Sequence, residues 1–211
     1  MKTYLFDFDG TLVDSMPTYV SLMLRILKEH GIAYSDDIVK IITPLGYQGT
    51  AEYYRSLGIS SPTEELVALM TQYAREEYAH NIPAKDTVPE TLVKLKARGN
   101  RLNVLTASPH TMLDPCLKRL GIWDLFDNVW SCEDFDTTKS DPNIYHLAAQ
   151  KLGLPVDEVI FVDDNVNAVK TAKLAGMRSY AIYDASSAEY EEEMRAISHR
   201  YVKNFAELLD E

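Results

Sequence analysis

The chain has 211 residues, of which 46% are hydrophobic and 25% are charged, and its 32 acidic and 21 basic residues give a formal net charge of -11. This composition is typical of a folded globular protein, excludes a largely disordered chain and allows one core with an insertion. The negative charge disfavours nucleic acid and anionic lipid as partners, and the absence of a leader-like or long apolar segment leads us to expect a cytoplasmic protein without membrane contact.

The first predicted strand is a short apolar run that ends in the sequence Asp7-Phe8-Asp9-Gly10-Thr11. Because side chains alternate along a strand, Asp7 and Asp9 are expected to project the same way where Gly10 lets the chain turn. Two carboxylates at about 4 Å repel by about 4 kcal/mol at an effective dielectric constant of about 20. A cation is therefore expected beside them, whereas Asp-Gly alone would indicate only a surface turn.

Residues 15–83 are predicted to be helical throughout. Apolar residues recur at three- and four-residue steps from Tyr19 to Leu27, and further helices are expected at residues 35–42, 49–57 and 64–80, with Pro and Gly between them. The sequence from Pro44 to Thr50 is expected to be a loop before a helix.

Beyond Pro83 the pattern alternates between helices and strands. Helices are expected at residues 88–99, 109–120, 142–152 and 166–175, and strands at 102–105, 129–130, 159–162 and 179–182. The acidic tail from Ala188 is expected to present a solvated helix face. The fold class is therefore α/β, a doubly wound, Rossmann-like parallel sheet formed by residues 1–14 and 84–211, with residues 15–83 inserted as a helical domain.

The carboxyl ends of the predicted strands carry the polar residues, and in a parallel sheet these ends meet at one edge. The set contains four carboxylates, two hydroxyls and one ammonium: Asp7, Asp9, Thr106, Ser108, Lys139, Asp163 and Asp164. Oxygen ligands without a His or Cys spacing favour a hard divalent ion, for which we expect Mg²⁺.

A phosphoryl group explains why these residue types occur together. A carboxylate approaches a phosphate dianion only if a metal ion and a lysine offset the repulsion, while hydroxyl and backbone donors hold the other oxygens. On this interpretation Asp7 attacks phosphorus, and Asp9 protonates the leaving oxygen and later accepts a proton from water.

The four motifs resemble those of the haloacid dehalogenase superfamily, in the subfamily of phosphoglycolate phosphatases and beta-phosphoglucomutases with a helical cap after the first motif. The resemblance covers essentially the whole chain. It implies an aspartyl-phosphate on Asp7, and an acid-base role for Asp9 with its backbone carbonyl on Mg²⁺. It also implies family positions for the remaining residues: the second-motif hydroxyl at Thr106, the third-motif lysine at Lys139, and metal ligands at Asp164 and Asp163.

Three departures refine what the resemblance implies. Asp9 is present, whereas dehalogenases lack this second acid, so phosphorus chemistry is favoured over carbon–halogen cleavage. Tyr19 stands where mutases of this type tend to have histidine, which disfavours a phosphosugar mutase. Ser140 replaces the first proline of the usual Lys-Pro-x-Pro sequence, so the loop that carries Lys139 lacks one stiffening residue.

Several substrate contacts are left as alternatives. Gly10 and Ser108 are candidate phosphate contacts, although Ser108 equally suits the cap of the next helix. Tyr47 and Gln48 are candidate specificity residues, with ordinary turn chemistry as the alternative. His110 is expected to face solvent in a first helical turn, with contact to the leaving group as the second possibility.

The sequence thus predicts a Mg²⁺-dependent phosphatase for a small phosphorylated metabolite, acting as a monomer or small homo-oligomer. The alternatives are a mutase of the same family, a receiver domain, and a non-catalytic, phosphate-responsive binding or regulatory protein. The order of the motifs and the helical insertion disfavour the receiver domain. Cys116 and Cys132 lie far apart and are expected to be buried free thiols.

Overall fold

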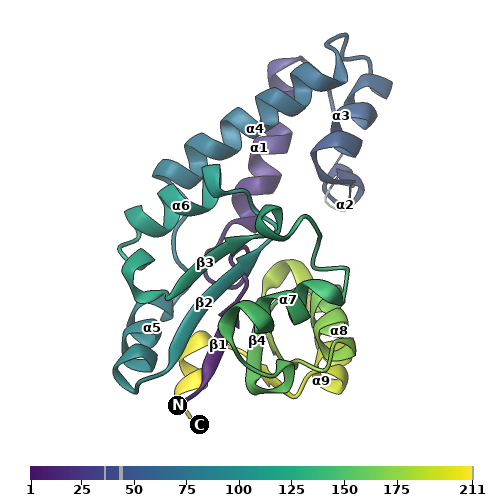
Figure 1. Cartoon of the computed structure of the whole chain (residues 1–211). Coiled ribbons are helices and arrows are strands. Elements are labelled where there is room, and N and C mark those ends of the chain that lie inside the picture. The colour runs from purple at the N-terminus through teal and green to yellow at the C-terminus, as the bar shows by residue number, and fades with distance from the viewer. Residues whose placement is uncertain (36, 43–44, 211) are drawn as a thin grey trace. The chain divides into compact units, whose positions relative to one another are not determined.

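The computed structural model describes residues 1–35, 37–42 and 45–210, which form two compact units (Figure 1). One unit contains Met1–Asp14 and Pro83–Glu211, and the other contains Ser15–Ile82. The second unit is therefore an insertion, because the chain leaves the first unit after Asp14 and returns to it at Pro83.

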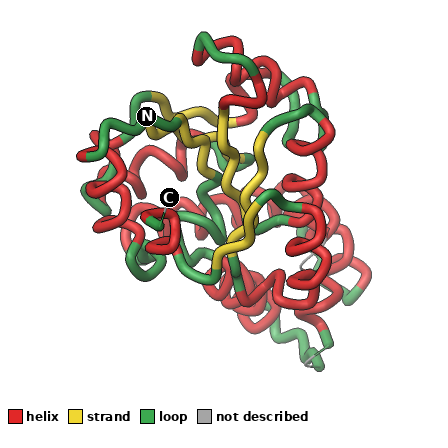
Figure 2. Tube along the Cα trace, turned by 90° about the horizontal axis from the view of Figure 1, so that it is seen from below, coloured by secondary structure: helices red, strands yellow, loops and turns green. Residues whose placement is uncertain are grey.

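The first unit is built around a parallel sheet of six strands in the order β3-β2-β1-β4-β5-β6 (Figure 2). The predicted α/β class with a parallel sheet is confirmed. The strands are β1 (Thr3–Phe6), β2 (Arg101–Thr106), β3 (Asn128–Ser131), β4 (Val159–Asp163), β5 (Arg178–Ile182) and β6 (Arg200–Val202).

The last of these strands lies in the tail, for which the sequence predicts only a solvated helix. The predicted helix is present as α9 (Glu191–Ile197), and β6 follows α9 in the chain. A strand of three residues is too short to show the alternation by which strands are recognised, and its pairing with β5 is a long-range contact.

Helices and aromatic rings cover both faces of the sheet. On one face, Leu5 and Phe161 pack with side chains of α7 (Asn143–Leu152) and α8 (Val166–Leu174). On the other face, Tyr4 and Phe6 stack with ring centroids 5.4 Å apart, and Phe6 contacts Phe205. The unit also contains α5 (Val88–Ala97) and α6 (His110–Arg119).

The order of the strands marks the end of β1 as the point where the direction of building reverses. From β1 the chain builds outward through β2 and β3, and then crosses back to β4 on the other side of β1. Ligands of open α/β sheets bind where the direction of building reverses in this way. Phe6 is paired with Val162, and the Asp7 amide donates to the Val162 carbonyl at 2.9 Å, so that Asp7 lies beside Asp163.

The second unit consists of four helices within its described residues. These are α1 (Met16–Glu29), α2 (Ile38–Ile42), α3 (Gly46–Ser56) and α4 (Thr63–His80). Helices α1 and α4 pack side by side (Figure 1), and the Tyr54 hydroxyl of α3 donates to the Met23 carbonyl of α1 at 2.9 Å. The predicted helical character of the insertion is confirmed.

Two predicted boundaries in this unit are wrong. The helix expected at residues 35–42 forms only from Ile38, and α3 begins at Gly46 instead of Gly49. The expected loop from Pro44 to Thr50 is therefore helical from Gly46 onward, while Pro44 lies outside the described residues. Gly46 has a φ of 63°, so the turn before α3 is made at this one residue. The residues that follow Gly46 therefore belong to the helix and not to a loop.

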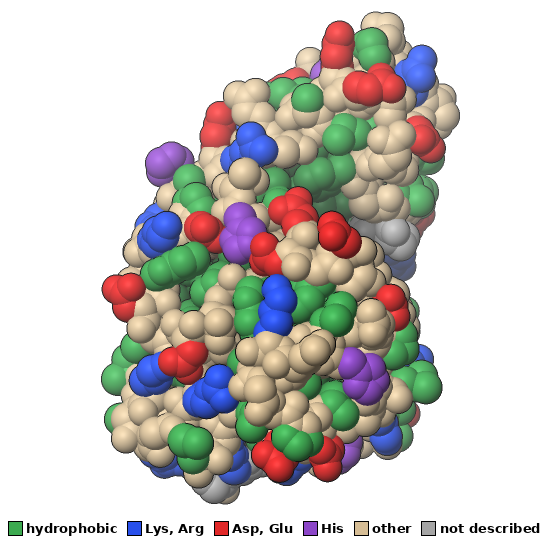
Figure 3. Space-filling model, in the orientation of Figure 1, with side chains coloured by type: hydrophobic (Ala, Val, Ile, Leu, Met, Phe, Trp, Pro, Cys, Tyr) green, Lys and Arg blue, Asp and Glu red, His purple; other side chains and the backbone are tan. Residues whose placement is uncertain are grey.

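The surface carries both acidic and basic side chains, in keeping with the charge balance of the chain. On the face drawn in Figure 3, basic side chains are scattered among acidic ones. Within the described ranges, every helix falls short of the length or the hydropathy that a bilayer-spanning segment needs.

Candidate active site

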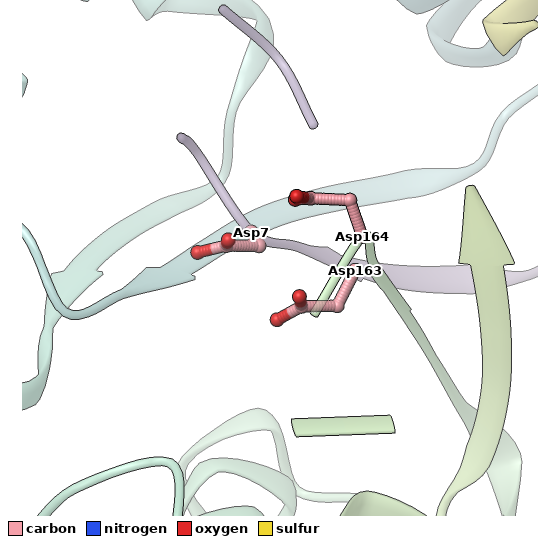
Figure 4. A group of neighbouring side chains, drawn as sticks. All are labelled: Asp7, Asp163 and Asp164. Carbon is pink, nitrogen blue, oxygen red and sulfur yellow. The ribbon is translucent and has the colours of Figure 1, made fainter. Parts of the chain in front are cut away.

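Three buried carboxylates lie together at the carboxyl ends of β1 and β4. Asp7 follows β1, Asp163 is the last residue of β4, and Asp164 is the next residue. One oxygen of each lies within 4.8 Å of the others, and the three carboxylates extend to the same side of the strand ends (Figure 4). The strand pairing thus brings together acids that are more than 150 positions apart in the sequence.

A single ammonium group is inserted into this cluster. The Nζ atom of Lys139 lies 2.7 Å from Asp7 Oδ1 and 2.7 Å from Asp163 Oδ2. Asp163 is held further by the backbone amide of Asn165, which donates to its Oδ1 at 2.7 Å. Lys139 therefore fixes the relative positions of the two strand-end acids.

Tyr145 supports the loop that carries Lys139, a contact that the sequence did not predict. Its hydroxyl lies 3.1 Å from the carbonyl oxygen of Lys139 and 3.1 Å from that of Ala168. The loop lacks the proline that Ser140 replaces, and the buried hydroxyl of Tyr145 supplies a restraint in its place.

The cluster carries an excess of negative charge. Burial and the neighbouring carboxylate of Asp163 raise the pKa of Asp7 to about 7, although Lys139 acts in the opposite direction. Burial, Asp163 and Asp7 raise the pKa of Asp164. Burial alone would lower the pKa of Lys139, but Asp163 and Asp7 raise it well above its ordinary value. Three carboxylates face one ammonium, so a further cation would stabilise their ionised forms.

The donor atoms at this point fit a hard divalent cation. They are carboxylate oxygens of Asp7, Asp163 and Asp164, and the cluster found among the described residues contains neither histidine nor cysteine. The hydroxyl of Thr11 donates to Asp164 Oδ1 at 2.9 Å and orients that carboxylate. A buried set of oxygens with surplus negative charge favours a hard divalent cation over softer metals.

Gly10 allows the backbone to approach the Asp164 carboxylate. Its φ is +72°, and a Cβ atom at this position would lie 2.4 Å from Asp164 Oδ2. Any side chain here would therefore displace the carboxylate, in addition to the cost of a left-handed conformation.

We expect Gly10→Ala to destabilise the fold and to weaken the binding of a divalent cation. Gly153→Ala is the matched control, because Gly153 has a φ of +71° and nothing within 4 Å of the added methyl group. The control should lose about 1–2 kcal/mol of unfolding free energy from the left-handed conformation alone. Urea unfolding of both variants measures the difference, and equal losses would show that the contact with Asp164 has no energetic effect.

Asp9 lies outside the carboxylate cluster and is bonded to the second motif. The Ser108 hydroxyl donates to Asp9 Oδ2 at 2.5 Å, and the Ser108 amide donates to the buried hydroxyl of Thr106 at 3.1 Å. Helix α6 begins at His110 with Pro109 as its N-cap residue, so the alternative that Ser108 caps this helix is wrong. Among the described residues, the carboxylate cluster thus contains Asp7, Asp163 and Asp164, and the Asp9 side chain instead contacts Ser108.

His110 lies in the first turn of α6, as expected, and its partly exposed side chain is held between two carboxylates. Its Nδ1 lies 2.7 Å from Asp114 and its Nε2 lies 2.8 Å from Asp134, with the side chain 35% exposed. Hydrogen bonding to Asp114 and to Asp134 raises the pKa of His110. This histidine therefore ties α6 to the segment after β3.

Asn165 provides the N-terminal cap of helix α8. Its side chain accepts hydrogen bonds from the amides of Asn167 and Ala168 at 3.0 and 3.2 Å. Because Asn165 satisfies these amides, the carboxylate of Asp164 is available to other partners.

The two candidate specificity residues lie on α3 in the second unit. The Tyr47 ring stacks on Tyr19, with centroids 6.0 Å apart and planes 8° from parallel. Gln48 is exposed, and its Nε2 donates to Glu52 Oε1 at 2.8 Å. Tyr47 is thus half-buried beside Tyr19, and Gln48 lies on the surface of this unit. The predicted buried free thiols are confirmed at Cys116 and Cys132.

Comparison with known proteins places this geometry in a family. A model of the haloacid dehalogenase-like hydrolases matches residues 1–176. A phosphoglycolate phosphatase of Pectobacterium atrosepticum is 30% identical over 182 residues, covering 82% of this chain and 76% of that protein. The pyrophosphatase PpaX of Bacillus velezensis is 29% identical over 181 residues, covering 84% of this chain and 81% of that protein.

Solved structures show the same fold. The crystal structure of CbbY from Rhodobacter sphaeroides in complex with phosphate has a TM-score of 0.78 and 20% identity, and covers 99% of this chain and 96% of that one. Since the family model spans most of the sequence and relatives match across both units, the family is established. The chain belongs to the haloacid dehalogenase-like hydrolases, and the relatives that it resembles in sequence are phosphatases.

Proposed function

We propose that this protein is a Mg²⁺-dependent phosphatase that hydrolyses a small phosphomonoester through an aspartyl-phosphate on Asp7. The observation that supports the proposal is the buried Asp7 carboxylate, which is paired with Lys139 at 2.7 Å and clustered with Asp163 and Asp164. A buried nucleophile with this charge environment suits a substrate that itself brings negative charge.

Asp9 takes part in both steps of the proposed reaction, first as the acid and then as the base. In the first step an Asp7 oxygen attacks phosphorus, the bond to the leaving oxygen breaks, and Asp9 donates its proton to that oxygen. In the second step Asp9 takes a proton from water as the water oxygen attacks phosphorus, and the Asp7 carboxylate is released with inorganic phosphate. Lys139 neutralises the phosphoryl oxygens and the hydroxyls of Thr106 and Ser108 hold them, while Gly10, whose amide donates to the Val13 carbonyl at 3.0 Å, shapes the turn beside them.

The bound cation supplies charge that allows a phosphate dianion to approach a carboxylate. We assign its protein ligands to the Asp7 and Asp164 carboxylates and the Asp9 backbone carbonyl, with Asp163 as a further ligand. Asp163 also holds Lys139, so its loss would disturb the ammonium as well as the cation.

The substrate that we propose is a small phosphorylated metabolite. Relatives named for phosphoglycolate and for N-acetylmuramic acid 6-phosphate support this class. Tyr47 and Gln48 remain our candidates for specificity, and we propose that the enzyme works in the cytoplasm as a monomer or small homo-oligomer. The two unpaired cysteines support a reducing compartment.

A phosphate-release screen tests the proposed function. Phosphoglycolate, sugar phosphates and nucleotides are each incubated with the protein in MgCl₂ and in EDTA, and released phosphate is measured. Release that requires Mg²⁺ is the expected result. Conversion of a sugar phosphate without net phosphate release would indicate a mutase, and no reaction with any substrate would contradict the proposal.

We expect Asp9→Asn to slow both formation and hydrolysis of the phospho-enzyme by about 10²–10⁴-fold each, because the amide neither donates an acidic proton nor accepts one. Rapid-quench measurements of phospho-enzyme and phosphate separate the two steps. Ser108→Ala is the companion variant, since it removes only the hydroxyl that contacts Asp9. A defect of Asp9→Asn confined to one step would refute the double role.

A further inference from the structure

Lys85 connects the turn after β1 to the segment after β5. Its Nζ atom lies 2.6 Å from the Gly10 carbonyl oxygen, 2.9 Å from the Tyr183 carbonyl oxygen and 2.8 Å from Asp184 Oδ2. An ammonium group has three N–H donors, so these three oxygens use all of them. The side chain is only 20% exposed, and its position is set by partners from distant parts of the sequence.

The Gly10 carbonyl belongs to the turn that borders the carboxylate cluster. The Gly10 backbone approaches Asp164 so closely that a Cβ atom would lie 2.4–2.7 Å from the carboxylate. The next residue, Thr11, donates its hydroxyl to the same carboxylate. A shift of this turn would therefore move both the surface and the hydrogen bond that orient Asp164.

Asp184 gives Lys85 a fixed anchor. Its side chain is 6% exposed and accepts hydrogen bonds from the Ser186 amide and hydroxyl at 2.8 and 2.6 Å. Burial alone would raise the pKa of Asp184, but the hydrogen bonds from Lys85 and Ser186 lower it. The anchor is therefore an ionised carboxylate that is itself held by its own turn.

The backbone of Lys85 is fixed as firmly as its side chain. Its amide donates to the Leu12 carbonyl at 3.0 Å, and the Asp14 amide donates to the Pro83 carbonyl at 3.0 Å. Residues 12–14 and 83–85 therefore pair at the two positions where the chain leaves and re-enters the first unit. Lys85 thus has little freedom to follow the Gly10 turn if that turn moves.

We propose that Lys85 is a positioning residue for the divalent-cation site, which it orders by holding the Gly10 carbonyl and thereby the Gly10–Thr11 turn against Asp164. The inference rests on the proposed function, since it concerns the cation of that site. Groups that contact metal ligands directly raise metal affinity by about 10–100-fold, and because Lys85 acts through the Gly10–Thr11 turn, the lower end of this range is expected.

The test compares Mg²⁺ binding by the whole protein in four forms, with isothermal titration calorimetry of MgCl₂ as the readout. Removing Lys85 alone would leave Asp184 buried and unpaired, so the informative variant is Lys85→Met with Asp184→Asn. It should raise the Mg²⁺ Kd by about tenfold or more. Asp184→Asn alone keeps the contact between Lys85 and Gly10 and should stay within about threefold of the wild-type value.

Lys96→Met is the matched control. It removes an ammonium group that pairs with Asp127, and the Asp127 amide donates to the carbonyl of Leu102, near the amino end of β2. The control should leave the Mg²⁺ Kd unchanged. In the phosphatase assay the double variant should need about tenfold more Mg²⁺ for half-maximal rate, with kcat recovered at saturating Mg²⁺, which a general loss of stability would not produce.

Two results would overturn the inference: wild-type Mg²⁺ affinity in the double variant, or an equal loss of affinity in Asp184→Asn alone. If the double variant does not fold, Lys85→Gln is measured in its place. The Mg²⁺ Kd of Lys85→Gln should rise severalfold, and a Kd equal to that of the wild-type protein would count against the inference. Absence of Mg²⁺ binding or of phosphate release in the wild-type protein would contradict the proposed function instead, so the two failures are distinguishable.

Discussion

Replacing Asp7 by asparagine is expected to reduce phosphate release by at least about 10³-fold while the protein remains folded. The amide keeps the shape of the side chain but has no anionic oxygen with which to attack phosphorus. Phospho-enzyme should be undetectable in this variant after incubation with any substrate that the wild-type protein hydrolyses.

The stability of Asp7→Asn shows whether Asp7 acts in catalysis or in stabilising the fold. A raised pKa means that the ionised Asp7 carboxylate destabilises the folded chain at pH 8, above the value of about 7. In EDTA the neutral variant should therefore unfold at the same or a higher urea concentration than the wild-type protein. Asp157→Asn, at an exposed position, is the control and should change neither activity nor stability. Substantial turnover by Asp7→Asn would disprove the nucleophile assignment.

Lys139→Met is expected to abolish turnover and, unlike Asp7→Asn, to destabilise the protein. The ammonium lies 2.7 Å from both Asp7 and Asp163, and its removal leaves two buried carboxylates without a counter-charge. Breaking a buried ion pair in this way costs about 3–5 kcal/mol. Urea unfolding in EDTA measures the loss, and Lys139→Arg, which keeps the charge, should lose less.

Mg²⁺ binding distinguishes the role of Lys139 from that of the metal ligands. Because Lys139→Met makes the cluster more negative, it should bind Mg²⁺ at least as tightly as the wild-type protein and still be inactive. Lys96→Met removes a half-exposed ion pair and should cost no more than about 1 kcal/mol. Retention of activity in Lys139→Met would mean that phosphate transfer at this site does not require an ammonium group.

The sequence and the structure agree most closely for the candidate catalytic and metal-binding residues that follow a strand. The sequence predicts Asp7 and the Asp163–Asp164 pair as site residues because each follows an apolar run, and the parallel sheet brings these strand ends together. Lys139 was placed by motif order, and the structure puts its ammonium between two of these acids. The catalytic roles of these residues stay predictions, for which the variants above are the tests.

Contacts that support the site were not predictable in the same way. The bond from Lys85 to Gly10 spans 75 positions and the one from Lys85 to Asp184 spans 99, and neither residue stands in a recognisable motif. Tyr145 looked like any buried aromatic residue of a helix, and only its hydroxyl contact with the Lys139 carbonyl shows that it supports the loop. His110 has one partner, Asp114, in its own helix, whereas its other partner, Asp134, comes from the segment after β3.

By itself the sequence determined the alternation of strands and helices, the helical insertion and the residue types at the strand ends, because periodicity and turn residues are local properties of the chain. Only the tertiary structure decided that β6 joins the sheet and that one lysine holds the Gly10 turn against Asp164. These features depend on pairing and packing between distant segments, which no local pattern encodes.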